Sequence, residues 1–229
     1  MKKALSSCRG RVLAAAALFF AGVEVATATG NEDVALPRPS RTGKASVEQA
    51  LAERRSVRAF AREALPLAAV SQLLWAAQGV TDPAGLRTAP SAGALYPLEV
   101  YLVAGAVSGL RSGVYHYDPG RHHLRLESEG DVRTRVAEAA LSQDWVAEAP
   151  AIVVLAAVIE RTASKYGERA PRYVHMEVGH AAQNVYLQAT ALGLGTTIVG
   201  AFRDEDLAHV LGLRAPVSPL ALLPVGRPR

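Results

Sequence analysis

The chain has 229 residues, of which 50% are hydrophobic and 20% are charged. This composition is typical of a globular domain with a substantial core, and it excludes an intrinsically disordered chain. The formal net charge is +4, but residues 1–28 hold four Lys or Arg and one Glu, so only about +1 belongs to the remainder. That nearly neutral remainder gives no reason to expect nucleic acid as a partner.

Residues 1–28 have the three parts of a secretory signal peptide. A basic start precedes an apolar and small run over residues 12–23, and Ala26-Thr27-Ala28 offers small residues where signal peptidase reads. We therefore expect cleavage after Ala28 and export, with a periplasmic location. An uncleaved N-terminal anchor is the alternative, although the apolar run is short for a membrane span. Nothing in the rest of the sequence predicts a stable span in the mature chain.

The sequence contains a single cysteine, Cys8, inside this segment. We therefore expect a mature protein with no disulfide and no thiolate site, which suits an oxidising compartment. Residues 29–45, which include Pro37, Pro39 and Gly43, predict an exposed linker. One domain follows over residues 46–229.

The domain begins with two helical patterns. Ser46 and Gln49 form a capping box at the start of the first, and the second runs from Pro66 to Gly79. Further helices are predicted over residues 131–141, 172–192 and 204–211, and strands over residues 98–104, 114–117, 122–126, 151–158, 196–202 and 220–225. Residues 80–97 are expected to form a long loop. Because helices and strands interleave without strict alternation, we expect an α+β sandwich rather than a doubly wound sheet.

Several functional classes lack their signatures. No Gly-x-Gly-x-x-Gly follows a strand and no P-loop motif occurs, which disfavours dinucleotide and triphosphate folds. No His-Glu-x-x-His motif is present, so we expect no metal site and interpret the histidines as structural or exposed. The chain also lacks the Gly-x-Ser-x-Gly elbow of serine hydrolases.

Three stretches do point to a ligand. Arg54, Arg55, Ser56 and Arg58 place three guanidiniums and a hydroxyl within five residues, and planar guanidiniums suit phosphate oxygens. A solvated basic helix end is the alternative interpretation. Residues 90–97 and 193–202 are rich in small side chains, which let backbone approach a flat ligand closely. Together the three stretches would describe a ligand with a phosphate at one end and an aromatic ring at the other.

These stretches resemble the FMN-dependent nitroreductase superfamily, and within it the SagB/thiazole-oxidase branch. The resemblance extends from about Ala45 to Pro228, with several motifs in matching order. The motifs are Arg-Arg-Ser-x-Arg-x-Phe at 54–60, Leu-Leu-Trp-Ala-Ala-Gln-Gly at 73–79, Pro-Ser-x-Gly-Ala-Leu-Tyr-Pro at 90–97, Glu-x-Gly-His-Ala-Ala-Gln-Asn at 177–184, Gly-Leu-Gly at 193–195 with Gly-Ala-Phe at 200–202, and Leu-Pro-Val-Gly at 223–226.

The resemblance implies a three-layer sandwich with a central mixed, mainly antiparallel sheet and a long central helix. It also implies a homodimer whose FMN site is built from both subunits. By similarity, the arginine and serine residues at 54, 55, 56 and 58 would hold the phosphate and ribityl end of FMN. The residues expected against the flavin from the neighbouring subunit are Pro90, Ser91, Ala92 and Gly93. The residues expected near the flavin N5 edge are Val199, Gly200 and Ala201. Arg227 or Arg229 would add a phosphate contact.

Lys165 and Tyr166 resemble the Lys-Tyr pair that azoline oxidases of this branch use for proton transfer. An ordinary polar helix start is the alternative, and the sequence leaves both open. We expect Glu177 to pair with an arginine. The function implied is an FMN-dependent oxidoreductase that transfers hydride between flavin and a small organic or peptide substrate, in either direction. Export favours oxidation of the substrate, with electrons passed to oxygen or a quinone rather than taken from a nicotinamide.

A different class of function remains as an alternative to the enzyme. In it the chain is an exported flavin- or ligand-binding protein on a nitroreductase-like fold without redox turnover.

Overall fold

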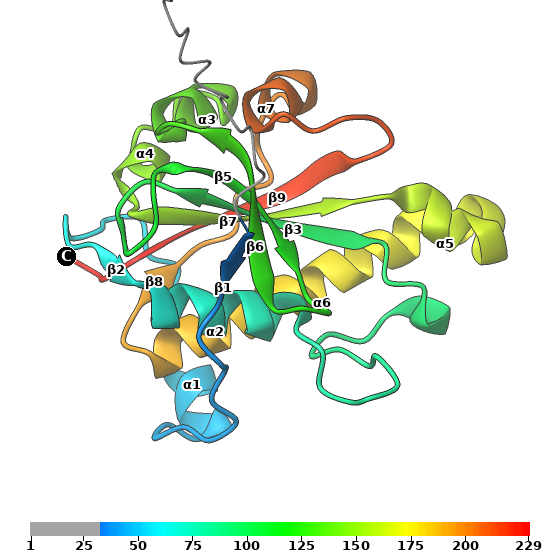
Figure 1. The fold of residues 1–229 in the computed structure, drawn as a ribbon, viewed down its shortest axis with the longest axis horizontal. Coiled ribbons are helices and arrows are strands. Elements are labelled where there is room, and N and C mark those ends of the chain that lie inside the picture. The colour runs from blue at the N-terminus through cyan, green and yellow to red at the C-terminus, as the bar shows by residue number, and fades with distance from the viewer. Residues whose placement is uncertain (1–32) are drawn as a thin grey trace, which may run out of the picture. The chain divides into compact units, whose positions relative to one another are not determined.

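A computed structural model describes residues 33–229, so the predicted signal peptide at residues 1–28 lies outside the described residues. A seven-stranded sheet crosses this domain in the order β1-β6-β5-β3-β7-β9-β8 (Figure 1). Its strands are β1 (Asp33–Ala35), β3 (Leu98–Ala104), β5 (Gly113–Asp118), β6 (His123–Glu129), β7 (Ala151–Ala157), β8 (Gly195–Thr196) and β9 (Ser218–Gly226).

Every strand pair within this sheet is antiparallel. Within the described residues, parallel pairing is confined to a separate pair, β2 (Leu65–Pro66) with β4 (Val107–Ser108), and to an isolated bridge between Ser56 and Thr196. β7 lies between β3 and β9 and is buried at all seven positions, as its unbroken apolar sequence predicts. The α+β class and the mainly antiparallel sheet are thus confirmed.

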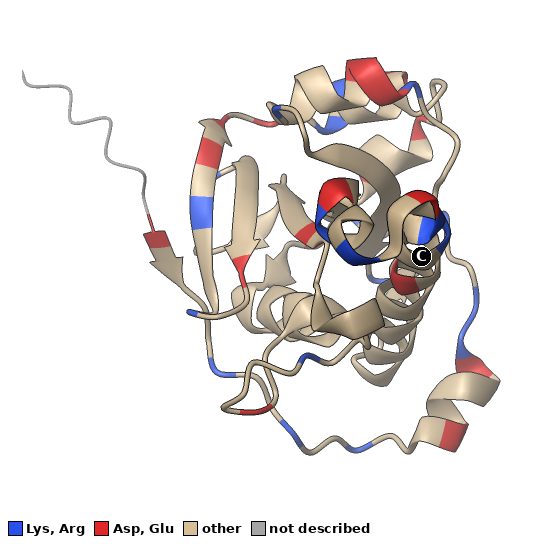
Figure 2. Ribbon diagram, turned by 90° about the vertical axis from the view of Figure 1, so that its right-hand side faces the viewer, with Lys and Arg blue, Asp and Glu red and all other residues tan. Residues whose placement is uncertain are grey.

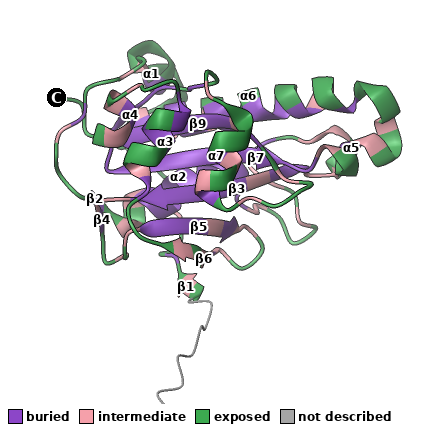
Figure 3. Ribbon diagram, turned by 90° about the horizontal axis from the view of Figure 1, so that it is seen from above, coloured by how far each residue is buried: buried purple, intermediate pink, exposed green. Residues whose placement is uncertain are grey.

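Helices cover both faces of the sheet and complete three layers (Figures 1 and 3). The face that carries α2 (Leu67–Gln78) and the 22-residue α6 (Ala170–Ala191) buries one apolar cluster. The opposite face buries a second cluster, under α3 (Arg133–Ala139), α4 (Trp145–Glu148) and α7 (Asp204–Leu211). The remaining helices are α1 (Val47–Glu53), α5 (Ile159–Tyr166) and the short turns η1 (Ala92–Ala94) and η2 (Gly167–Arg169).

Local signals in the sequence fix several boundaries. The Ser46 side chain accepts a hydrogen bond from the Gln49 N–H at 3.1 Å and begins α1, as the capping box predicts. Gly79 ends α2. The predicted strand at 98–104, the hairpin of β5 and β6 and the helix at 204–211 are all present.

One predicted strand needs correction. The predicted strand at 196–202 does not continue past Thr196, the last residue of β8, because Ile198 and Val199 each bind a different partner: the Ile198 N–H donates to the Tyr186 hydroxyl, while Val199 pairs singly with Leu222. The described part of the predicted exposed linker, residues 33–45, is mostly exposed and also contacts the domain. β1 pairs with β6, and the Ser40 N–H donates to Gln72 Oε1 at 2.8 Å.

Candidate active site

The arginine segment runs from the end of α1 along β8. The Val57 N–H donates to the Thr196 carbonyl at 3.0 Å, and Ser56 bridges to the same residue. Gly195 makes this approach possible, because a Cβ on it would lie 2.5 Å from Val57 Cγ2. The segment predicted to bind phosphate therefore lies directly beside the small-residue stretch that follows α6.

The guanidiniums of this segment contact rings and carbonyls rather than carboxylates. Arg54 lies 5.3 Å from the ring centroid of Tyr186, and Arg58 lies 5.8 Å from that of Trp145. Arg55 Nη1 donates to the carbonyls of Ala52 and Arg54. Among residues 33–229, none of the three arginines joins an ion pair. Their charge is therefore not neutralised within this part of the chain.

Tyr186, which the sequence analysis missed, connects these two stretches. Its hydroxyl accepts the Ile198 N–H at 2.8 Å, donates to Thr197 Oγ1 at 3.2 Å and lies 3.5 Å from Ser56 Oγ. Burial raises the pKa of Tyr186, but these hydrogen bonds and the Arg54 charge outweigh burial, so the pKa is lowered. The only sequence signal for this role is the position of Tyr186 beside Val185, on the flank of the apolar stripe of α6.

The stretch predicted to face the flavin N5 edge divides into two parts. Val199 is buried, and its N–H and carbonyl both bond to Leu222 at 2.8 and 2.9 Å. Gly200 and Ala201 are exposed. Val199 thus anchors the stretch to β9, and Gly200 and Ala201 remain to present backbone to a ligand.

The end of the chain lies against the arginine segment. Phe60 bridges to Pro228, and the Ala61 N–H donates to the Arg227 carbonyl at 2.9 Å. The Arg227 side chain pairs with Glu63 at 2.9 Å. The backbone therefore brings Arg227 next to the segment at 54–60, while its guanidinium contacts a carboxylate.

The predicted residues at 90–93 lie elsewhere, on the flank of α6. The Ala92 N–H donates to Glu177 Oε1 at 2.9 Å, so the expectation that Glu177 pairs with an arginine is wrong. Burial raises the pKa of the Glu177 carboxyl, against opposing effects from Ala92, Ser91 and His180. Pro90 and Gly93 are exposed, while Ser91 and Ala92 are half-buried.

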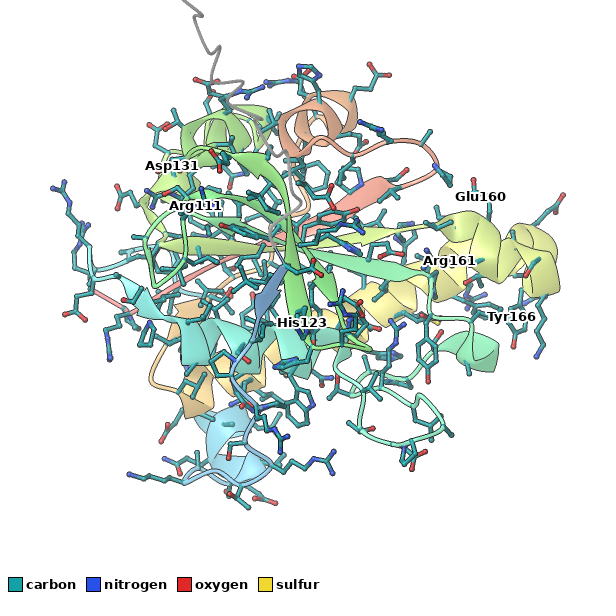
Figure 4. The ribbon with its side chains drawn as sticks, viewed as in Figure 1. Arg111, His123, Asp131, Glu160, Arg161 and Tyr166 are labelled. Carbon is teal, nitrogen blue, oxygen red and sulfur yellow. The ribbon has the colours of Figure 1, made fainter. Side chains whose placement is uncertain are left out.

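Lys165 and Tyr166 lie against this same turn. They end α5, and Figure 4 shows Arg161 and Tyr166 on the side of that helix facing η1, with Glu160 on the other. A Cβ on Gly93 would lie 3.0 Å from Tyr166 Oη and 3.1 Å from Lys165 Nζ. The structure therefore brings the predicted proton-transfer pair together with the turn predicted to contact flavin.

Within one chain, the candidate residues form two groups separated by α6. Glu177 belongs to the group at α5, and Tyr186 belongs to the group at the arginine segment. Their separation of nine positions corresponds to two and a half turns, so they lie on opposite flanks of α6 and about 13.5 Å apart along it. Figure 1 likewise shows α5 and β8 at opposite ends of α6.

Other kinds of site find no support in residues 33–229. No group of three His, Cys, Asp or Glu residues in this range could hold a metal ion. No helix in this range has both the length and the hydropathy needed to cross a bilayer. Figure 2, which looks onto the α5 end, shows acidic and basic residues interspersed there rather than one basic patch.

Comparison with known proteins agrees with the fold and the motif order. The model of the Nitroreductase family matches residues 51–227. A candidate nitroreductase of Methanocaldococcus jannaschii, MJ1384, is 50% identical over 181 residues, which cover 79% of this chain and 90% of that protein.

Solved structures give the same result. A nitroreductase structure from Ralstonia eutropha has a TM-score of 0.77 and 31% identity, covering 88% of this chain and 91% of that one. A chain of the Escherichia coli microcin synthetase McbBCD complex has a TM-score of 0.70 and 25% identity, covering 93% of this chain and 85% of that one. This chain is an oxidoreductase of the nitroreductase family, and its relatives include members of the SagB-type branch.

Proposed function

We propose that this protein binds FMN and transfers hydride between the flavin and a small organic or peptide substrate. The observation that carries the proposal is the set of three guanidiniums, on Arg54, Arg55 and Arg58, that join no ion pair within residues 33–229. A phosphate monoester would supply the missing charge, and the exposed Ser56 hydroxyl would add a hydrogen bond.

The backbone beside this segment fits the ring of the same cofactor. Gly200 and Ala201 follow the buried Val199 and are exposed. Their own side chains are a hydrogen atom and a methyl group, so they leave the backbone open to a ligand. When bound, FMN would supply the hydride acceptor or donor. The chain would supply the phosphate cradle, the backbone next to the ring and the proton-transfer groups.

We assign the proton-transfer role to Lys165 and Tyr166. Moving hydride between flavin and a carbon atom of the substrate also requires a proton to leave or reach a neighbouring atom, which calls for a nearby acid or base. Lys165 Nζ lies 5.6 Å from the Tyr166 ring centroid, so the amine and phenol are close to one another. The relative in the McbBCD complex was solved with truncated pro-MccB17 bound, which supports including peptides among the substrates.

We further propose a homodimer in which each site takes residues from both chains. The two groups on opposite flanks of α6 cannot contact the same side of one flavin ring within a chain, whereas a second copy can bring its turn at 90–93 to the arginine segment. Large apolar side chains are exposed on α1, α6 and the following stretch: Val47, Leu51, Met176, Leu192 and Ile198. A subunit interface would cover such side chains.

We also propose that residues 1–28 direct export and are cleaved after Ala28, giving a periplasmic protein that passes electrons to oxygen or a quinone. N-terminal sequencing of the protein recovered from a periplasmic extract would test this, since an intact N-terminus would contradict cleavage.

The central test is the flavin itself. Purified protein, reconstituted with FMN, should be yellow, and its visible absorbance should bleach when NADH, NADPH, dithionite or a quinol is added anaerobically. Dithionite reduces any bound flavin and is the positive control, and among NADH, NADPH and the quinol the donor that bleaches the flavin fastest identifies where electrons enter. Protein that stays colourless after reconstitution would overturn the enzyme proposal and favour a binding protein without turnover.

A further inference from the structure

The turn between residues 91 and 96 has an unusual backbone. Gly93, Ala94 and Tyr96 have positive φ angles of 63°, 54° and 47°. Ala and Tyr rarely adopt this left-handed region, because their Cβ atoms crowd the neighbouring carbonyl. A turn with two such residues needs support from the surrounding structure.

Glu177 on α6 supplies that support. Its Oε1 accepts the Ala92 N–H at 2.9 Å, and the Ser91 hydroxyl lies close enough to the carboxylate to act as a donor that lowers its pKa. Ser91 Oγ in turn accepts the Tyr96 N–H at 2.9 Å. Only 3% of Glu177 is exposed. One buried carboxylate thus holds the start of the turn directly and its end through Ser91.

The other side of the turn rests on α5. Gly93 lies so close to Tyr166 Oη and Lys165 Nζ that a Cβ would come within 3.0 and 3.1 Å of them. The turn therefore lies between Glu177 and the Lys165–Tyr166 pair. Any movement of the turn would change what the amine and the phenol contact.

We infer that Glu177 is a positioning residue that holds the turn at 91–96 against Lys165 and Tyr166 and so fixes where those two groups lie. The effect on catalysis rests on the proposed function, since it assumes that Lys165 and Tyr166 transfer protons. The effect on the turn itself does not depend on flavin.

Hydrogen exchange measures the turn directly. Glu177→Ala removes the acceptor, so the Ala92 and Tyr96 amides should exchange about tenfold faster or more than in the wild type. Glu177→Gln keeps one oxygen for Ala92 and should restore most of the protection of that amide. Glu168→Ala, which removes an exposed carboxylate from η2, should change the exchange rate of neither the Ala92 nor the Tyr96 amide. If Glu177→Ala does not fold, Ser91→Ala gives the same test at Tyr96 alone.

Lysine acetylation measures the position of the amine. Lys44 and Lys165 are the lysines of residues 33–229, so Lys44 serves as an internal reference. With a trace of N-hydroxysuccinimidyl acetate and detection by mass spectrometry, the ratio of acetylation at Lys165 to that at Lys44 should change at least about threefold in Glu177→Ala. In Glu177→Gln and Glu168→Ala the ratio should stay near that of the wild type. A role confined to global stability would leave this ratio unchanged.

These measurements separate the inference from the proposed function. Wild-type exchange and acetylation ratios in Glu177→Ala would overturn the positioning role, whatever the colour of the protein. In the FMN-loaded protein, Glu177→Ala should lower the rate of substrate-linked flavin turnover about tenfold while FMN affinity stays unchanged, with recovery in Glu177→Gln. Equal rates in wild type and Glu177→Ala would contradict the catalytic part.

Discussion

Ser56 Oγ lies 3.5 Å from the hydroxyl of Tyr186 and joins the arginine segment to the C-terminal part of the long helix α6. The same hydroxyl binds Thr197 and the Ile198 N–H, so two stretches that are distant in sequence meet at one oxygen. The two stretches are those that we assign to the phosphate and to the ring of FMN. Their relative position is therefore set before any ligand binds.

Replacing Tyr186 with Phe should weaken FMN binding about tenfold, because the Ile198 N–H and the Thr197 hydroxyl lose their partner and the two stretches separate. The measurement is FMN affinity by fluorescence quenching. Tyr115→Phe is the matched control, since it removes another buried hydroxyl, one that donates to the Arg111 carbonyl at 2.8 Å far from the site. Equal loss of FMN affinity in both variants would show a general effect of destabilisation instead.

The double variant Arg54→Ala and Arg58→Ala should lose flavin before it loses its fold. Each guanidinium contacts only an aromatic ring among the contacts described, so truncation should cost about 1 kcal/mol of stability per site. Two charge-assisted bonds to phosphate are worth more than that in affinity. A double variant at Arg121 and Arg125, on the opposite edge of the sheet, is the control. An Arg54/Arg58 variant as yellow as the wild type would refute the phosphate assignment.

Gly93→Ala should reduce turnover more than it reduces stability. The new Cβ suffers from the positive φ and also meets Tyr166 Oη and Lys165 Nζ. Gly85→Ala separates these causes, because Gly85 has a φ of 85° with nothing within 4 Å of its Cβ position. Both variants should lose about 1 kcal/mol in a denaturant titration. Turnover should fall only in Gly93→Ala, and a parallel fall in both would remove the turn from the site.

A site shared between subunits predicts complementation. The Arg54/Arg58 variant and the Gly93→Ala variant should each be inactive, but after mixing through denaturation and refolding, half of the dimers hold one copy of each. One of the two sites in such a dimer is intact, so about a quarter of wild-type activity should return. Mixtures with no recovery, or a mature holoprotein that sediments as a monomer, would contradict the shared site.

Stability in acid should depend on the ion pair between Arg133 and Asp131, the latter labelled in Figure 4. The Arg133 guanidinium donates to both oxygens of Asp131 and lowers the pKa of that carboxyl below its usual 3.8. A lowered pKa in the folded state adds stability above about pH 3.8, and that stability is lost as the pH falls through the folded-state value. Asp131→Asn should therefore melt below the wild type at pH 7, with the gap closing below pH 4.

Glu160→Gln, at an exposed position on α5, should follow the wild type at every pH. A constant gap between Asp131→Asn and the wild type across this range would mean that the carboxylate charge is not what matters.

Most of the fold could be predicted from the regular spacing of apolar residues in the sequence. β7 and α6 were predicted closely because an unbroken apolar run and a stripe with helical spacing are local patterns. The strand predicted at 196–202 is wrong beyond Thr196 because Ile198 and Val199 make isolated long-range contacts, to Tyr186 and Leu222 respectively. No local sequence pattern encodes such contacts. α5 was missed because its polar sequence follows β7 without a break.

For the site, the motifs located the arginine segment and the turn, but not the residues that hold them. Glu177 contacts Ala92, 85 positions away in the sequence, and Tyr186 contacts Ser56, 130 positions away. Only the folded arrangement shows that they serve two separate groups.

Because Glu177 and Tyr186 stand on one uninterrupted helix, the number of residues between them matters more than the identity of those residues. Inserting or deleting one residue between them would rotate one side chain by about 100° relative to the other. Either the turn at 91–96 or the arginine segment would then lose its anchor. The interior of α6 should therefore tolerate substitution on its exposed face, yet accept no change in length.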